Sequence, residues 1–84
     1  MIQGVKISKL KIISDNRGKV MHMLRNDSPV FKSFGEVYFS TIYENKIKAW
    51  HLHKESYLNY ACIFGEVKLA LFDDRKNSPT NNEY

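Results

Sequence analysis

The stretch that decides the fold covers residues 58–72 and reads LNYACIFGEVKLALF. Its two apolar runs, residues 58–64 and 67–72, each have the length and composition of a short β-strand. They flank Gly65-Glu66, a dipeptide that suits a tight reversal of the chain. This pattern predicts a β-hairpin centred on Gly65.

Outward from this hairpin, the chain contains further short segments with strand character and no convincing amphipathic helix. The predicted strands are residues 5–7, 10–13, 19–24, 37–43 and 46–53, and turn-forming sequences occupy residues 14–18, 26–29, 44–45 and 73–79. Six or so short strands at close spacing predict an all-β sandwich or barrel. The unpaired edges of so small a sheet favour a homodimer, formed by pairing or exchange of N-terminal strands in residues 5–13.

The composition describes an ordinary globular chain. Its 84 residues allow one domain, with 43% hydrophobic and 26% charged residues. A single cysteine, Cys62, excludes an internal disulfide and a cysteine-based metal site, and no apolar run suits a membrane span or a secretion signal. We therefore predict a cytoplasmic protein with no membrane partner. The net charge of +4 is mild: a solvated surface explains it, and an anionic partner is the alternative.

His51-Leu52-His53 is the main chemical signal. Histidines two positions apart on a strand project to the same side, where they can bind a metal or share acid–base work. The alternative is a pair of surface or core histidines without chemistry. Set against the metal-binding cupin pattern, Gly65 matches the last glycine, but Leu58 replaces the glutamate ligand and Asn45 the first glycine. We therefore predict no metal and no other cofactor.

Four blocks of the sequence resemble one enzyme superfamily. Residues 48–54 (KAWHLHK) resemble the Arg-Gly-x-His-x-His-Lys stretch of deoxythymidine-diphosphate (dTDP) sugar 3,4-ketoisomerases. Residues 15–18 (DNRG) resemble an early turn found both there and in dTDP-4-dehydrorhamnose 3,5-epimerases. Residues 65–67 (GEV) and 72–80 (FDDRKNSPT) resemble the epimerase segments Gly-x-Val and Val-Asp-x-Arg-x-x-Ser-Pro-Thr. The blocks stand in family order.

This resemblance implies a fold, a reaction and a set of residues. The fold is a cupin-like jelly roll or β-barrel, with residues 1–84 as one epimerase-type domain whose C-terminal part is absent from this chain. The reaction is epimerisation or isomerisation of a nucleotide-linked 4-keto-6-deoxy sugar in surface-polysaccharide biosynthesis. Residue by residue, His51 falls on the catalytic base and His53 on the second ketoisomerase histidine. Lys48 replaces a family arginine, and Arg17 matches the arginine of the early turn, so both are expected to bind substrate.

Departures from the family pattern keep two alternatives open. Leu58 and Leu69 stand where the epimerases have a lysine and an aspartate, and His22 stands where they have a glutamate. The family's acid tyrosine and histidine-orienting aspartate would lie beyond Tyr84. A non-catalytic sugar- or nucleotide-binding cupin is therefore the second hypothesis. A nucleic-acid-binding β-barrel, suggested by aromatic residues such as Trp50 among lysines, is the third and least favoured.

Overall fold

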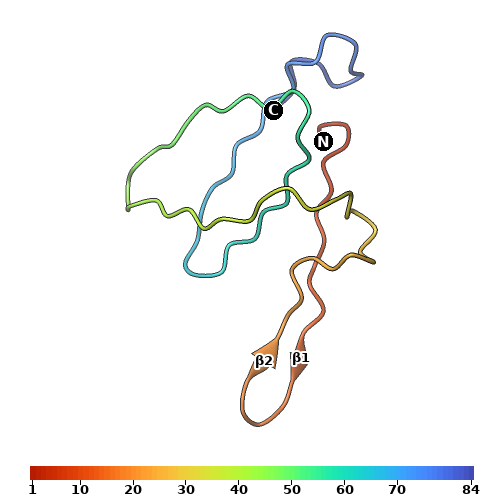
Figure 1. Cartoon of the computed structure of the whole chain (residues 1–84). Coiled ribbons are helices and arrows are strands. Elements are labelled where there is room, and N and C mark those ends of the chain that lie inside the picture. Colours follow the sequence, from red (N-terminus) through yellow and green to blue (C-terminus); the bar gives the residue numbers. More distant parts are fainter. The chain divides into compact units, whose positions relative to one another are not determined.

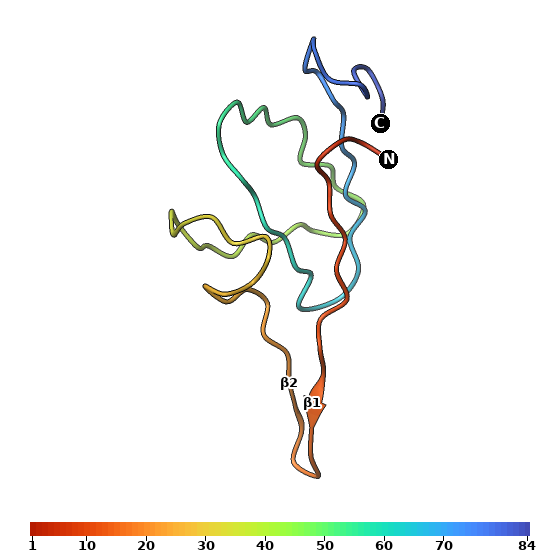
Figure 2. The same cartoon turned by 90° about the vertical axis from the view of Figure 1, so that its right-hand side faces the viewer.

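One antiparallel hairpin is the regular secondary structure of the chain. The computed structural model describes all residues 1–84, and its two strands are β1 (Ile13–Ser14) and β2 (Lys19–Val20). Ile13 pairs with Val20 and Ser14 with Lys19. Figure 1 and Figure 2 show where β1 and β2 lie, next to each other in the chain's one hairpin. The rest of the chain is turns, bends and extended backbone. The structure contains no helix with the length and apolar character needed to cross a lipid bilayer.

The β1–β2 hairpin forms because Asp15 satisfies the backbone of its turn. The Asp15 carboxylate Oδ1 accepts hydrogen bonds from the backbone N–H of Arg17 at 2.8 Å and of Gly18 at 3.3 Å. The Asp15 N–H donates to the Gly18 carbonyl at 3.0 Å. An aspartate that bonds the backbone two and three residues on fixes a tight turn, as its side-chain chemistry predicts. The predicted turn at residues 14–18 is confirmed, except that Ser14 belongs to β1.

The other predicted turns form at the expected places. The Ser28 N–H donates to the Arg25 carbonyl at 3.0 Å, and the Lys46 N–H donates to the Tyr43 carbonyl at 3.1 Å. Asn45, inside the second of these turns, has φ 61°, a conformation that asparagine tolerates better than most residues. The predicted strands in residues 37–72 are extended but unpaired. The cupin-like jelly roll therefore stays a prediction.

The structure has no apolar core. No hydrophobic side chain is buried, and residues that the sequence pattern assigns to a core, such as Val37, Ile63 and Leu69, are exposed. The single buried residue is Asp73, with 3% of its surface exposed. Local order in this chain therefore comes from hydrogen bonds between polar groups rather than from apolar packing.

Two compact units make up the chain. The first joins Met1–Met23 to Ala61–Tyr84 and contains the β1–β2 hairpin and the loop of residues 73–83. The second is Leu24–Tyr60 and contains the two predicted catalytic histidines. Within this second unit, the Lys32 ammonium lies 5.2 Å from the centre of the Tyr57 ring, a cation–π contact.

Candidate functional site

His51 and His53 both lie on an extended, exposed segment of the second unit. Exposure leaves the imidazoles accessible to a ligand. Two imidazoles on one strand face of a cupin-like barrel are expected to point into the barrel mouth. The chain forms no barrel, so this expectation stays a prediction. No group of three or more histidine, cysteine, aspartate or glutamate side chains gathers in the structure, and the predicted absence of a metal stays a prediction.

Lys48 has a fixed position on the same segment. Its ammonium Nζ donates to the Ser40 hydroxyl at 2.8 Å and to the Thr41 carbonyl at 2.9 Å. These bonds tie residue 48 back across the turn at residues 44–45. An ammonium has three protons to donate, so one remains for a ligand. Lys48 can therefore offer a positioned positive charge three residues before His51.

Arg17 lies in the first unit, on the turn between β1 and β2. The Asp15 Oδ2 accepts from the Arg17 guanidinium at Nη2 (2.7 Å) and at Nε (3.3 Å). The Arg17 side chain is nonetheless 86% exposed, and its Nη1 is free. The hydrogen bond from the Arg17 side chain, then that from its backbone N–H, lowers the pKa of Asp15. The guanidinium is thus held on one edge and open on the other, which suits binding of an anion.

The four predicted site residues are divided between the units. Lys48, His51 and His53 lie in Leu24–Tyr60, and Arg17 lies in the unit that contains Met1–Met23. Two shallow surface depressions lie elsewhere: one is lined by Met1 and residues 82–84, the other by Gln3 and residues 75–79. Neither depression includes a predicted site residue.

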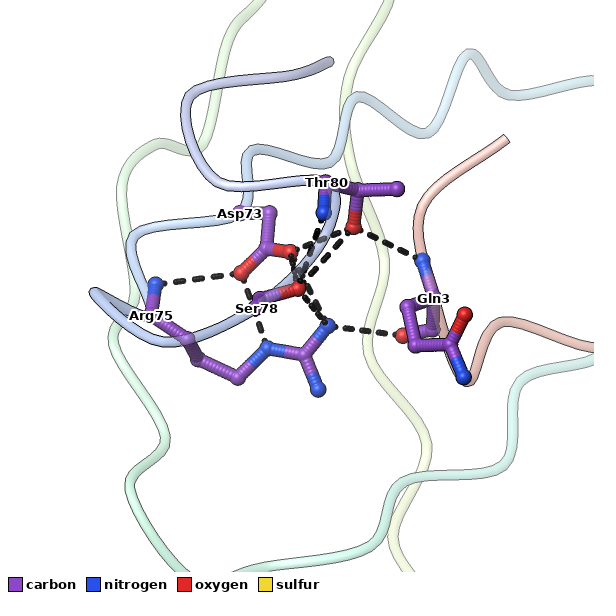
Figure 3. Close-up of polar contacts among 5 residues, drawn as sticks. All are labelled: Gln3, Asp73, Arg75, Ser78 and Thr80. Atoms are coloured by element: carbon purple, nitrogen blue, oxygen red, sulfur yellow. Dashed lines mark hydrogen bonds and ion pairs between the residues drawn. The ribbon is translucent and has the colours of Figure 1, made fainter.

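A polar cluster surrounds Asp73, the buried residue of the structure, in a segment predicted to be a polar turn (Figure 3). Asp73 Oδ1 accepts from the Arg75 backbone N–H at 3.0 Å and from Arg75 Nε at 2.8 Å. Asp73 Oδ2 accepts from Arg75 Nη2 at 2.9 Å and from the hydroxyls of Ser78 and Thr80, each at 2.6 Å. The spacing Asp-x-Arg-x-x-Ser-x-Thr was the available signal, because it places three donors within seven residues of one carboxylate.

Comparison with curated proteins relates the chain to sugar biosynthesis. It is 31% identical over 84 residues, 98% of the chain, to the "Probable low-salt glycan biosynthesis epimerase Agl13" of Haloferax volcanii. It is 35% identical over 83 residues, 99% of the chain, to the "Spore coat polysaccharide biosynthesis protein SpsL" of Bacillus subtilis. The chain covers 54% and 55% of these two proteins, about half of their length. No family model and no solved structure matches the chain.

These similarities are to proteins named for sugar-polymer biosynthesis. One relative is named as an epimerase, and the names of both place them in the biosynthesis of a glycan or polysaccharide. The resemblance inferred from four sequence blocks agrees with these names at that coarse level. Its finer content, a dTDP-linked sugar and a cupin fold, goes beyond what the relatives' names state.

Proposed function

We propose that this chain belongs to an epimerase or isomerase that acts on a nucleotide-linked 4-keto-6-deoxy sugar in surface-polysaccharide biosynthesis. The similarity that extends over 98% of the chain to a protein named as a glycan biosynthesis epimerase carries this proposal. The order of the four sequence blocks, with His51-Leu52-His53 among them, adds support from the residues themselves.

The proposed chemistry is proton transfer next to a ketone. The C4 ketone of such a sugar acidifies the neighbouring C–H bonds, and a neutral imidazole removes one of these protons to leave an enolate. A proton returned to the opposite face inverts that carbon, and one returned elsewhere moves the carbonyl. Neither outcome changes the overall oxidation state, so the reaction needs no redox cofactor. His51 takes the role of base, and His53 orients it or relays its proton.

The proposed substrate is also an anion, because a diphosphate joins its sugar to its nucleoside. Lys48 offers an ammonium that Ser40 and Thr41 hold in place. Arg17 offers a guanidinium whose inner edge is occupied by Asp15 and whose outer edge is free. Fixed cations lose less side-chain freedom when they bind a phosphate than mobile ones do. We therefore assign both residues to recognition of the diphosphate rather than to the proton transfer.

A non-catalytic sugar- or nucleotide-binding protein is the second candidate. The apolar residues Leu58 and Leu69, which stand where the resembled epimerases have charged groups, favour it. Both leucine side chains are exposed, with 46% and 57% of their surface accessible. Packing in an apolar core therefore does not explain why these two positions are apolar. A protein without these groups retains a means of holding an anion but has fewer groups for proton transfer.

Solvent-deuterium exchange separates the two candidates. A panel of 4-keto sugar nucleotides is incubated with the protein in D₂O, and NMR reports which sugar carbon gains deuterium. Exchange supports an enzyme, and the labelled carbon distinguishes epimerisation from 3,4-isomerisation. Binding without exchange at any carbon would favour the binding protein.

The His51→Ala and His53→Ala variants test the assignment of the base. Loss of the base affects the transition state more than substrate binding, so His51→Ala should abolish exchange while the nucleotide sugar still binds. His53→Ala should reduce exchange less. Wild-type exchange in a folded His51→Ala protein would contradict the assignment.

The proposal includes a homodimer, because the exposed apolar side chains and the unpaired outer edges of the two-stranded hairpin need a covering surface. The mass of one chain is 9.9 kDa, and light scattering at micromolar concentration should give twice this value. A stable monomer would contradict this part of the proposal and leave the chemistry unaffected.

A further inference from the structure

The backbone of residue 3 is bound at both of its polar atoms by the loop of residues 73–83. The Gln3 N–H donates to the Thr80 hydroxyl Oγ1 at 2.9 Å, and the Gln3 carbonyl accepts from Arg75 Nη2 at 2.7 Å. The Gln3 side-chain amide takes no part in these bonds, as Figure 3 shows. The loop therefore recognises the backbone of one residue, through the N–H of the peptide before it and the carbonyl of the peptide after it, and not a particular side chain.

Asp73 prepares the two groups that bind residue 3. A hydroxyl has one proton, and Ser78 and Thr80 both direct theirs to Asp73 Oδ2 at 2.6 Å. The Thr80 oxygen therefore has only lone pairs left to offer, which is what the Gln3 N–H requires. Two guanidinium nitrogens of Arg75 are held by the same carboxylate, and this turns Nη2 toward the Gln3 carbonyl. The Asp73 carboxylate thus orients both the acceptor, Thr80 Oγ1, and the donor, Arg75 Nη2, that bind residue 3.

The loop itself is closed by its own backbone. The Asp73 N–H donates to the Glu83 carbonyl at 2.9 Å, and the Asn82 N–H donates to the Asp73 carbonyl at 2.7 Å. Asn82 has φ 68°, a left-handed conformation that completes the reversal. These bonds involve only residues 73–83, so the loop needs no contribution from the N-terminal segment to keep its shape.

We propose that residues 73–83 form a preformed clamp for the peptide backbone at position 3, which straps the N-terminal segment to the C-terminal loop regardless of the side chain at that position. Proline is the one residue the clamp rejects, since it has no N–H to donate. With only two hydrogen bonds, the strap is reversible: the neutral bond to Thr80 favours the closed form about fivefold, and the charge-assisted bond from Arg75 favours it more. The proposal is independent of any catalytic role of the chain.

Amide hydrogen exchange followed by NMR tests the clamp, with the Gln3 amide as reporter of the strap and the Asn82 amide as reporter of the loop. Thr80→Val removes the acceptor for the Gln3 N–H together with one of the hydrogen bonds to Asp73 Oδ2. Gln3 protection should therefore fall about fivefold, and Asn82 protection should fall less, because the backbone bonds that close the loop remain. Thr80→Ser keeps the hydroxyl and is the matched control, so both amides should stay protected. In Gln3→Ala, the amide at position 3 should keep its protection, because the side chain is not read.

Three results would overturn the proposal. One is an amide of Gln3 in the unmodified chain that exchanges at the rate of an unstructured peptide. Another is a loss of protection in Thr80→Val that is as large at Asn82 as at Gln3, which would show that the Thr80 hydroxyl acts by holding the loop together rather than by binding residue 3. The third is loss of protection in Gln3→Ala. None of these readings depends on enzymatic activity, so they are separate from the test of the proposed reaction.

Discussion

Two turns in this chain use the same Asp-x-Arg sequence and leave their arginines in different states. In both, the aspartate Oδ1 accepts the backbone N–H two residues on, at 2.8 Å for Asp15 and 3.0 Å for Asp73, and Oδ2 accepts from the arginine Nη2. The side chain of Asp15 is 50% exposed, whereas that of Asp73 is 1% exposed. Arg17 keeps a free edge, whereas Arg75 also bonds Ser78 and the carbonyl of Gln3.

The difference shows that the local motif fixes the turn but not the use of the arginine. Ser78 and Thr80, which lie outside the motif, close the second turn around its carboxylate. The first turn is followed by β2 and has no such donors, so its guanidinium remains available to an anion. An Asp-x-Arg pair therefore becomes structural or ligand-binding according to what the next few residues supply.

The largest expected effect is the loss of the closed turn. Asp73→Asn replaces one acceptor oxygen by an NH₂ group, which cannot accept from the Ser78 and Thr80 hydroxyls and repels the Arg75 guanidinium. Amide exchange at Asn82 should accelerate more than about tenfold, since hydrogen bonds to a charged group are the strong ones.

The matched variant is Asp15→Asn, because asparagine still bonds the backbone of an exposed turn. Its effect on exchange at Gly18 should be about twofold or less. Comparable losses at the two turns would show that burial does not distinguish them.

An intermediate effect is expected for anion binding at the open turn. Arg17→Ala should weaken the binding of deoxythymidine diphosphate by about tenfold, because a positioned guanidinium forms charge-assisted hydrogen bonds with phosphate. Isothermal titration calorimetry measures the change in Kd. Lys19→Ala is the control, since it removes the same charge from β2 of the same hairpin. An equal loss of affinity in both variants would assign the effect to net charge.

The smallest expected effect is a difference in acid titration. Bonds from Arg75, Ser78 and Thr80, in that order, lower the pKa of Asp73 far below its ordinary value, whereas Arg17 lowers the pKa of Asp15 less. A lowered pKa gives stability that is present above about pH 4 and is lost as the pH falls through the folded-state value. Carboxyl ¹³C shifts recorded by NMR between about pH 7 and 2 should therefore show Asp15 protonating first. Protonation of Asp73 before Asp15 would reverse the comparison.

Local side-chain chemistry made part of this structure predictable. Asp15 bonds backbone groups within three residues of itself, and Asn45 adopts the positive φ that its turn requires, so both turns could be predicted from sequence alone. The strands predicted in residues 58–72 do not follow from local chemistry in this way, because a strand needs a partner and a buried face to become part of a stable sheet. The chain covers about half of its curated relatives, and it contains no such face.

The candidate site residues come from a sequence motif, whereas their surroundings come from the structure. The motif that contains His51 and His53 predicts acid–base chemistry, and this assignment stays a prediction. The ties that hold Lys48 could not be predicted, because Ser40 and Thr41 carry no motif and reach it only once the turn at residues 44–45 forms. The Asp73 cluster differs from Lys48 in this respect, because its donors do belong to a motif, and only their convergence on one carboxylate required the structure.

The contacts inside the C-terminal loop join residues close in sequence, whereas those of Gln3 join residues far apart. This difference sets the order in which the contacts form during folding. The loop of residues 73–83 joins groups at most ten positions apart, and loops of that length close in about 10–100 ns. The bond between Gln3 and Thr80 spans 77 positions, which costs about 2 kcal/mol more in chain entropy. During folding, the C-terminal loop is therefore complete before the N-terminal segment reaches it, and the strap is the last of these contacts to form.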